Sequence, residues 1–249
     1  MPLTDAHPDV LRPDAGTVLV SPWIVPEPRF QEAAANALLD AWEKQRRLPD
    51  AMLALAVFLS TDGTHVLHYA QWTDDEAHRE WARAARPAAL VPIDEAIPGI
   101  RRPGVVRYRR YRSHVPERPG APRPGFVATP AFATTGPDTQ RALAGTVVER
   151  LARERVPGLL GAHFHLSEDG TRVLNHAEWT DRSAWEEFAA GGVSARLREA
   201  IGALPGVSPA PAVPLDAPAA SAAPAAPRPP VAGYRLHRTL VNVPSPRAR

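Results

Sequence analysis

The sequence predicts an α+β fold built from two ferredoxin-like (βαββαβ) domains, and three observations support this prediction. First, residues 60–74 (STDGTHVLHYAQWTD) and 167–181 (SEDGTRVLNHAEWTD) are identical at 10 of 15 positions. Second, the chain around both segments shows the same order of predicted strands and helices. Third, proline accounts for 29 of 249 residues, about 12% against a usual content of about 5%. It is concentrated in residues 1–30, 116–124 and 208–230.

Each copy opens with an apolar strand, predicted at 17–25 and at 126–133, and a helix follows it. We predict this helix at 29–47 in the first copy and at 138–155 in the second. Asp138 is a suitable N-cap for the second of these helices. Apolar residues spaced by four indicate its buried face (Leu143, Val147 and Leu151).

A hairpin, a second helix and a last strand complete each copy. Asp-Gly pairs, which are typical of hairpin turns, stand at 62–63 and 169–170. They join strands 51–59 and 64–73 in the first copy, and strands 159–166 and 171–180 in the second. The second helix is predicted at 74–86 and 181–200, and the last strand at 104–114 and 232–243.

These elements give the predicted domain boundaries. The first domain spans 17–115 after an N-terminal tail (1–16), and the second spans 125–243 before a C-terminal tail (244–249). A proline-rich linker (116–124) joins the two domains, and a proline- and alanine-rich insertion (208–230) interrupts the second domain before its last strand. A ferredoxin-like sheet carries helices on one face only, so we expect the two domains to pack sheet to sheet as an intramolecular dimeric α/β barrel.

Composition narrows the classes of function. The chain has no cysteine, which excludes thiol catalysis, iron–sulfur clusters and thiolate zinc sites. We find no run of about 20 apolar residues and no signal-peptide pattern, so we expect a cytoplasmic protein without a membrane partner. The net charge is only +2, which does not favour a nucleic-acid partner, and no glycine-rich loop indicates nucleotide or flavin binding.

Strand alternation predicts which side chains of the second hairpin share a face. Four apolar residues of its first strand lie on one face (Leu160, Ala162, Phe164 and Leu166). Pairing this face with the apolar side chains of strand 171–180 requires a hairpin loop of two or four residues. In that register Asn175 stands opposite Phe164.

Each copy therefore carries one polar residue in an apolar stripe, Asn175 in the second copy and His68 in the first. Each of them stands four positions before a tryptophan, Trp179 or Trp72. A buried polar side chain costs about 1–3 kcal/mol when it has no hydrogen-bond partner. It is tolerated when it bonds the neighbouring backbone beside a core tryptophan, or when it serves a ligand, and the pattern leaves both readings open.

The segment 157–188 (PGLLGAHFHLSEDGTRVLNHAEWTDRSAWEEF) resembles the antibiotic biosynthesis monooxygenase (ABM) family of dimeric α/β barrels, and roughly 100 residues in each half share this resemblance. The resemblance implies that Asn175 and Trp179 line a substrate pocket between the sheet and the helices. In the first copy Trp72 matches the family pattern, whereas His68 replaces the asparagine.

The family resemblance also implies an activity. Quinone-forming members oxidise an anthrone- or phenol-type aromatic polyketide with O₂, without a metal or a cofactor, in antibiotic or pigment biosynthesis. On this basis the second copy is the predicted active half, with Asn175 and Trp179 as catalytic residues. The predicted substrate-binding residues are Phe164, Trp185, Phe188, Trp72 and His68. Association of two tandem chains as a homodimer is left open.

Other functions also stay open. The chain could be a non-catalytic or cyclase-assisting module that binds polyketides, or a haem-degrading oxygenase in which His78 is a loose candidate for the axial ligand. Four residues of the second hairpin have side chains of the kind that bind metals, which suggests a metal site (His163, His165, His176 and Glu178). Their spacing, however, is not diagnostic of one. The arginine-rich run 101–112 has a composition seen in nucleic-acid binding, but we interpret it as a solvated last strand.

Overall fold

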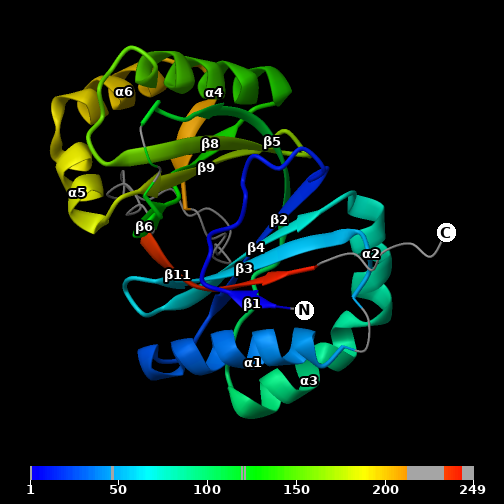
Figure 1. Ribbon diagram of the computed structural model, residues 1–249. Coiled ribbons are helices and arrows are strands. Elements are labelled where there is room, and N and C mark those ends of the chain that lie inside the picture. The colour runs from blue at the N-terminus through cyan, green and yellow to red at the C-terminus, as the bar shows by residue number, and fades with distance from the viewer. Residues whose placement is uncertain (1, 46–47, 119, 121, 212–232, 243–249) are drawn as a thin grey trace, which may run out of the picture. The chain divides into compact units, whose positions relative to one another are not determined.

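A computed structural model describes residues 2–45, 48–118, 120, 122–211 and 233–242. The chain forms two compact units. Unit 1 comprises Met1–Arg107 and Arg235–Arg249, and unit 2 comprises Tyr108–Tyr234. Each unit combines an antiparallel sheet with three α-helices (Figure 1), which confirms the predicted α+β class with ferredoxin-like units.

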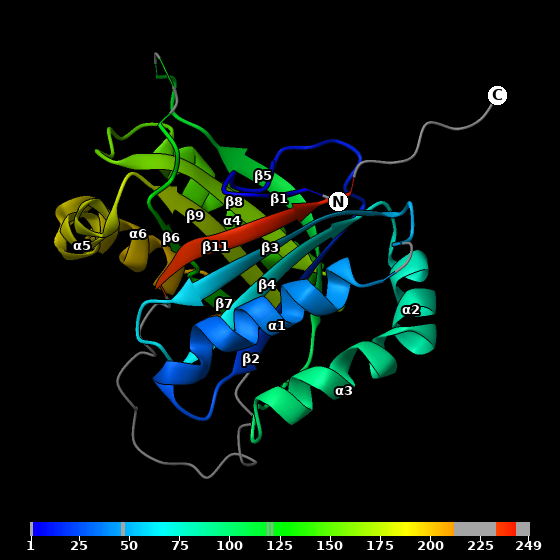
Figure 2. The same cartoon turned by 60° about the horizontal axis from the view of Figure 1, so that its bottom comes forward.

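The sheet of unit 1 has the strand order β1-β11-β3-β4-β2. Its strands are β1 (Leu3–Thr4), β2 (Thr17–Ile24), β3 (Met52–Ser60), β4 (His65–Trp72) and, from Arg235 onward, β11 (Gly233–Val241). Its helices are the short η1 (Pro28–Phe30), α1 (Gln31–Glu43), α2 (Asp75–Ala84) and α3 (Arg86–Ala96). Figure 2 shows α1 and α3 lying across one face of this sheet, where the apolar core of the unit is formed.

The sheet of unit 2 has the strand order β5-β8-β9-β7-β10, with β6 also paired to β9. Its strands are β5 (Val106–His114, from Tyr108 onward), β6 (Phe126–Ala128), β7 (Ala131–Thr134), β8 (Leu159–Ser167), β9 (Arg172–Trp179) and β10 (Val207–Ala210). Its helices are α4 (Pro137–Leu151), α5 (Arg182–Ala190) and α6 (Gly192–Gly202). A second, separate apolar core lies between these helices and the sheet.

The last strand of each sequence copy belongs to the unit built mainly by the other copy. β5 ends the first copy, yet it pairs with β8 in unit 2 (Tyr108↔Ser167). β11 ends the second copy, yet it pairs with β1 in unit 1 (Leu3↔Leu240). The compact units therefore do not follow the predicted domain boundaries of 17–115 and 125–243, which are limits of the sequence copies.

β10 lies beside β7 and completes that edge of the unit 2 sheet. The predicted insertion 208–230 therefore begins inside a strand, because Ser208–Ala210 belong to β10. The rest of the predicted insertion and the predicted tail 244–249 lie outside the described residues, apart from Pro211. Within the described part of the chain, no helix is both long enough and apolar enough to cross a membrane.

A buried glutamine fastens the first helix of each unit to the hairpin. In unit 1, Gln31 Nε2 donates to the backbone oxygen of Ser60 at 2.9 Å and to that of His65 at 2.8 Å. In unit 2, Gln140 Nε2 donates to the corresponding oxygens, of Ser167 at 3.1 Å and of Arg172 at 2.8 Å. The two units thus share a contact that the sequence comparison did not single out.

Three local predictions are wrong. Asp138 is not the N-cap of its helix, because α4 begins at Pro137 and Gly136 occupies the cap position; proline at the first helical position favours that start. The second helix of the second copy is two helices instead of one, because the extended backbone of Gly191 separates α5 from α6. In the first copy the predicted helix 74–86 corresponds to α2, and the further helix α3 was not predicted; Pro87, which has no N–H to donate to the Arg83 oxygen, favours the break between them.

The third wrong prediction concerns the face of β8. A β-bulge between Leu159 and Gly161 shifts the register at the start of this strand, and a bulge reverses which residues face the core. Leu159 is therefore fully buried opposite Trp179, whereas Leu160 is only partly buried. β3 carries the matching irregularity between Met52 and Ala54.

Candidate functional site

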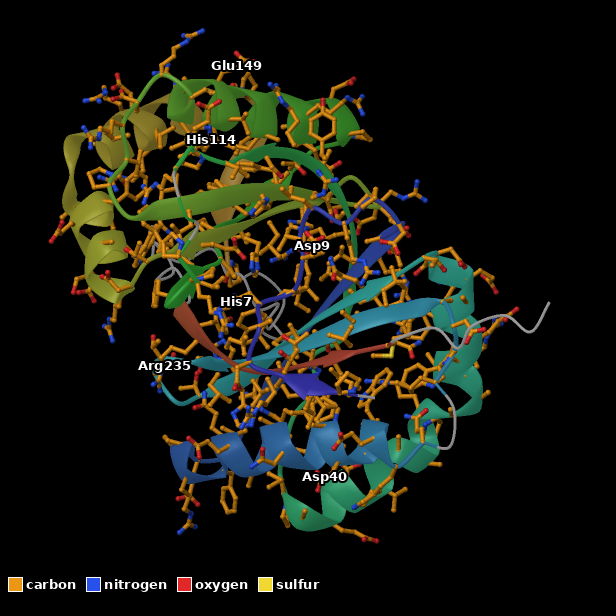
Figure 3. All side chains as sticks on the ribbon, in the orientation of Figure 1. His7, Asp9, Asp40, His114, Glu149 and Arg235 are labelled. Carbon is orange, nitrogen blue, oxygen red and sulfur yellow. The ribbon has the colours of Figure 1, made fainter. Side chains whose placement is uncertain are left out.

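A cavity of about 240 Å³ lies between the sheet and the helices of unit 2. It brings together five of the predicted site residues, contributed by β8, β9 and α5: Phe164, Asn175, Trp179, Trp185 and Phe188. Its other walls come from β7, α4, α6 and β10. Figure 3 shows the side chains of both units, with Glu149 marking α4 and Asp40 marking α1.

The register of the β8–β9 hairpin places Asn175 in this cavity. The two strands are joined by four residues, 168–171, and Phe164 pairs with Asn175, which confirms the predicted pairing. On the other side of β9, the backbone N–H of Asn175 donates to the Pro130 oxygen at 2.9 Å. The backbone of Asn175 is thus held by β8 on one side and by Pro130 on the other, which fixes the point from which its side chain enters the cavity.

The polar atoms of Asn175 and Trp179 are not used by the protein itself. Asn175 Oδ1 and Trp179 Nε1 are buried and have no hydrogen-bond partner among the described residues. The two residues are 9% and 1% exposed, respectively. Of the two readings that the sequence left open, this arrangement disfavours a locally bonded asparagine, because an unpartnered buried polar group costs about 1–3 kcal/mol.

Three aromatic rings form one wall of the unit 2 cavity. The Trp179 ring lies 5.4 Å from the Trp185 ring, in an edge-to-face arrangement, and 5.0 Å from the Phe188 ring. These are the distances at which aromatic rings attract one another. The wall is therefore aromatic and apolar, and it offers both ring faces and ring edges to an aromatic ligand.

Helix α6 contributes lining residues that the sequence analysis missed, namely Leu197, Arg198 and Ile201. Arg198 donates to the Ala189 oxygen at 3.0 Å and to Ser194 Oγ at 2.7 Å, which fixes its guanidinium at the cavity wall. The spacing of Leu197 and Ile201 by four could have revealed this helical face, had the break at Gly191 been predicted.

His68 and Trp72 lie in a separate cavity of about 220 Å³ in unit 1. This cavity occupies the corresponding place between β2, β3, β4 and helices α1, α2 and α3. The Trp23 ring packs edge-to-face on His68 at 4.4 Å. His68 Nε2 and Trp72 Nε1 are buried without a hydrogen-bond partner among the described residues, as are the corresponding groups of unit 2.

The environment of His68 keeps its imidazole neutral. Burial, together with the positive charges of Arg86 and Arg102, lowers the pKa of His68 to about 3. Nearby, burial and Arg107 lower the pKa of His78 to about 4. His78 packs edge-to-face on Trp72 at 5.1 Å.

Four polar residues of the second hairpin lie on the opposite face of β8 and β9 from the cavity. The carboxylate of Glu178 lies between two imidazoles, 3.6 Å from His163 Nε2 and 3.7 Å from His176 Nε2. Burial raises the pKa of Glu178, but the hydrogen bonds and charges of His163 and His176 lower it by more. The pKa of Glu178 therefore lies well below its usual range. His165 Nδ1 lies 2.9 Å from the His163 oxygen. Among the described residues, no group of three or more such side chains is arranged to hold a metal ion.

Four of the six arginines in the 101–112 run each form an ion pair with a different carboxylate. Ion pairs join Arg102 to Asp94, Arg107 to Asp75, Arg109 to Glu168 and Arg112 to Glu149.

Comparison with known proteins gives the following relationships. Residues 131–200 match the model of the antibiotic biosynthesis monooxygenase family. A solved anthrone oxidase-like protein is 15% identical over 96% of both chains, with a TM-score of 0.63, so the fold is shared along almost the whole length. A monooxygenase from the gene ActVA-Orf6 of Streptomyces coelicolor, solved with nanaomycin D, is 45% identical over 33% of this chain and 77% of that chain, with a TM-score of 0.31. No curated protein matches the chain.

Proposed function

Because the chain belongs to the antibiotic biosynthesis monooxygenase family, we propose that unit 2 is a cofactor-independent monooxygenase site. Its substrate is an anthrone- or phenol-type aromatic polyketide in antibiotic or pigment biosynthesis, which it oxidises to a quinone with O₂. The matched residues 131–200 lie wholly within unit 2 and include Asn175 and Trp179.

One observation carries this proposal. Two buried hydrogen-bonding side chains, Asn175 and Trp179, stand without partners on the wall of a mainly apolar cavity. A flat aromatic ligand fills such a cavity, and its hydroxyl groups and oxygen atoms supply partners of the matching kind. In the proposed complex a phenolic O–H donates to Asn175 Oδ1 and the Asn175 Nδ2 group donates to the enolate oxygen, while the Trp179 indole N–H donates to a ring oxygen or to the peroxide. Donors fixed in advance around developing charge contribute about 3–4 kcal/mol each in other enzymes.

The proposed reaction needs no oxidant other than O₂. The CH₂ carbon of an anthrone loses a proton and gives a delocalised enolate, which passes one electron to O₂. The carbon radical and superoxide combine to form a peroxide, which takes up a proton. Loss of the second C–H proton breaks the O–O bond, leaves C=O on carbon and releases water. The two C–H bonds supply the four electrons that reduce O₂.

The cavity is suited to a substrate that has already lost its first proton. Its described lining contains no Asp, Glu or His that could take a proton from carbon. We therefore propose that the enolate itself binds after its proton has passed to water. The Arg198 guanidinium, held at the wall by Ala189 and Ser194, stabilises the negative charge of this form.

Oxygen uptake with an anthrone tests the proposal. Wild-type protein is expected to consume one O₂ for each quinone formed, and to do so equally with and without a chelator. Asn175→Ala is expected to lower kcat/KM at least 100-fold. His68→Ala is the matched control at the corresponding position of unit 1, and it is expected to leave the rate unchanged.

Each alternative has a distinct outcome in the same experiment. Binding of the anthrone without any oxygen uptake would contradict the enzyme proposal and support the non-catalytic binding module. Loss of activity with a chelator would contradict the cofactor-independent mechanism. A Soret band on addition of haem, abolished by His78→Ala, would support the haem-degrading alternative instead.

A further inference from the structure

We infer that the unit 1 cavity is a second ligand site, which takes an aromatic carboxylate with its anionic group facing Arg86 and Arg107. This inference does not depend on the proposed oxidation in unit 2. It rests on the charges and unpartnered hydrogen-bond donors around the unit 1 cavity. The ligand class follows from the combination of an apolar chamber and a cationic wall.

Arg86 is a cation without a partner on the cavity wall. It is partly buried and lines the cavity, and its guanidinium forms no ion pair or hydrogen bond with any described residue. Burial and the nearby Arg102 lower its pKa, which shows that its positive charge is poorly compensated. Arg86 is also the first residue of α3, whose N-terminus has no side-chain cap and so adds a positive helix end.

Arg107 provides a second donor group on the same wall. Its Nε lies 3.0 Å from Asp75 Oδ1, which fixes the guanidinium in place. Its Nη1 is buried and has no partner among the described residues. Part of the donor capacity of Arg107 is therefore left for a ligand, and a planar guanidinium matches a carboxylate well.

Two further polar atoms of the cavity, on Trp72 and His68, also lack partners. The indole N–H of Trp72 is buried and unbonded, and so is Nε2 of His68. Both residues line the cavity, and Trp72 is 0% and His68 7% exposed, so each is more than nine-tenths buried. No Asp or Glu is present in the described lining. The wall thus offers several donors and no anionic acceptor, which a carboxylate supplies.

The apolar part of the unit 1 cavity fits an aromatic body. Trp23, Trp72 and Trp81 are on its walls together with the aliphatic Leu55 and Ile93. A partly buried cation such as Arg86 in such surroundings is stabilised when a counter-ion accompanies it. The unit 2 cavity differs because its arginine, Arg198, is already bonded to a carbonyl and a hydroxyl group.

Isothermal titration calorimetry with 2-naphthoate and its neutral analogue 2-naphthamide tests this inference at pH 7. Wild-type protein is expected to bind 2-naphthoate at least tenfold more tightly than 2-naphthamide. Arg86→Gln is expected to weaken 2-naphthoate binding at least tenfold, and Arg86→Lys is expected to retain part of it. Arg83→Gln is the matched control, because Arg83 is an exposed residue of the neighbouring helix α2.

The same substitution in unit 2, Arg198→Gln, distinguishes the two cavities. It removes any 2-naphthoate binding that Arg198 supports in unit 2 and is expected to leave the Arg86-dependent binding intact, and circular dichroism of each variant checks that the fold is retained. Three results would overturn the inference: no binding of 2-naphthoate, equal binding of the amide, or a loss of binding in Arg198→Gln instead of Arg86→Gln.

Discussion

The two units place cavities of similar volume, about 240 and 220 Å³, at the same position of the same fold, but they surround them with different charges. Both cavities contain a buried tryptophan with an unpartnered N–H, Trp179 in unit 2 and Trp72 in unit 1. Four residues earlier, unit 2 has an amide and unit 1 has an imidazole. Shared backbone geometry therefore fixes where the tryptophan lies, whereas single side chains decide what chemistry is available beside it.

The aromatic walls differ as well. Trp179 is flanked by Trp185 and Phe188 of α5, whose tilted rings form an apolar surface of the cavity. In unit 1, Trp81 of α2 instead stacks on Trp42 of α1 at 4.4 Å. The Trp81 indole N–H donates to Gln45 at 3.1 Å. Unit 1 thus uses its helix aromatics partly to hold its own helices together, which fits the more polar chamber inferred for it.

The largest expected effect comes from exchanging the two residues that distinguish the cavities. Asn175→His is expected to lower kcat/KM for anthrone oxidation at least 100-fold, because the amide donor is lost from a dry pocket. His68→Asn is expected to leave the rate unchanged, as measured with an oxygen electrode. The double variant is expected to stay inactive, since unit 1 does not repeat the arrangement of Trp185 and Phe188 around the tryptophan and stacks its Trp81 on Trp42 instead. Recovery of activity in the double variant would show that this one position decides which unit is active.

A smaller effect concerns the dependence of stability on pH. The pKa of His68 is about 3 in the folded protein and about 6.5 in the unfolded chain. Between these values the unfolded chain binds a proton that the folded protein does not bind, so stability falls as the pH is lowered. Between pH 7 and pH 5 this one group should lower the free energy of unfolding by about 2 kcal/mol.

Urea denaturation of wild type and His68→Asn at both pH values isolates that contribution. The substituted asparagine does not titrate, so the other histidines contribute equally to both proteins. We expect the variant to gain stability relative to wild type as the pH falls. An unchanged difference between the two proteins from pH 7 to pH 5 would mean that His68 is charged or exposed in the folded protein.

The smallest expected effect tests whether the two units share their scaffold. Gln31→Met and Gln140→Met each remove one amide that donates to buried oxygens of the hairpin. Each substitution should destabilise its own unit by about 1–2 kcal/mol, because buried acceptors lose their donor. Hydrogen exchange measured by mass spectrometry should show faster exchange in the β3–β4 or β8–β9 hairpin, respectively. Clearly unequal effects would argue against an equivalent role of the two glutamines.

Local chemistry made the hairpins predictable. The Asp-Gly turns are present, with Gly63 and Gly170 both at φ +76°, where a side chain would be strained. Alternation of apolar residues then fixed the Phe164↔Asn175 register, because a one-residue slip would turn the apolar face to water. The bulge at Leu159 could not be predicted in this way, since alternation assumes an uninterrupted strand.

The sequence by itself determined the two copies, the class of the fold and the side chains that share a face, because turns and alternating patterns act over a few residues. Only the tertiary structure decided that each last strand joins the unit of the other copy, since strand pairing depends on contacts far apart in the chain. It also decided which polar atoms lack partners and that Arg86 and Arg198 reach the cavities. Hydrogen bonding and charge compensation depend on neighbours from several elements, and no local pattern encodes them.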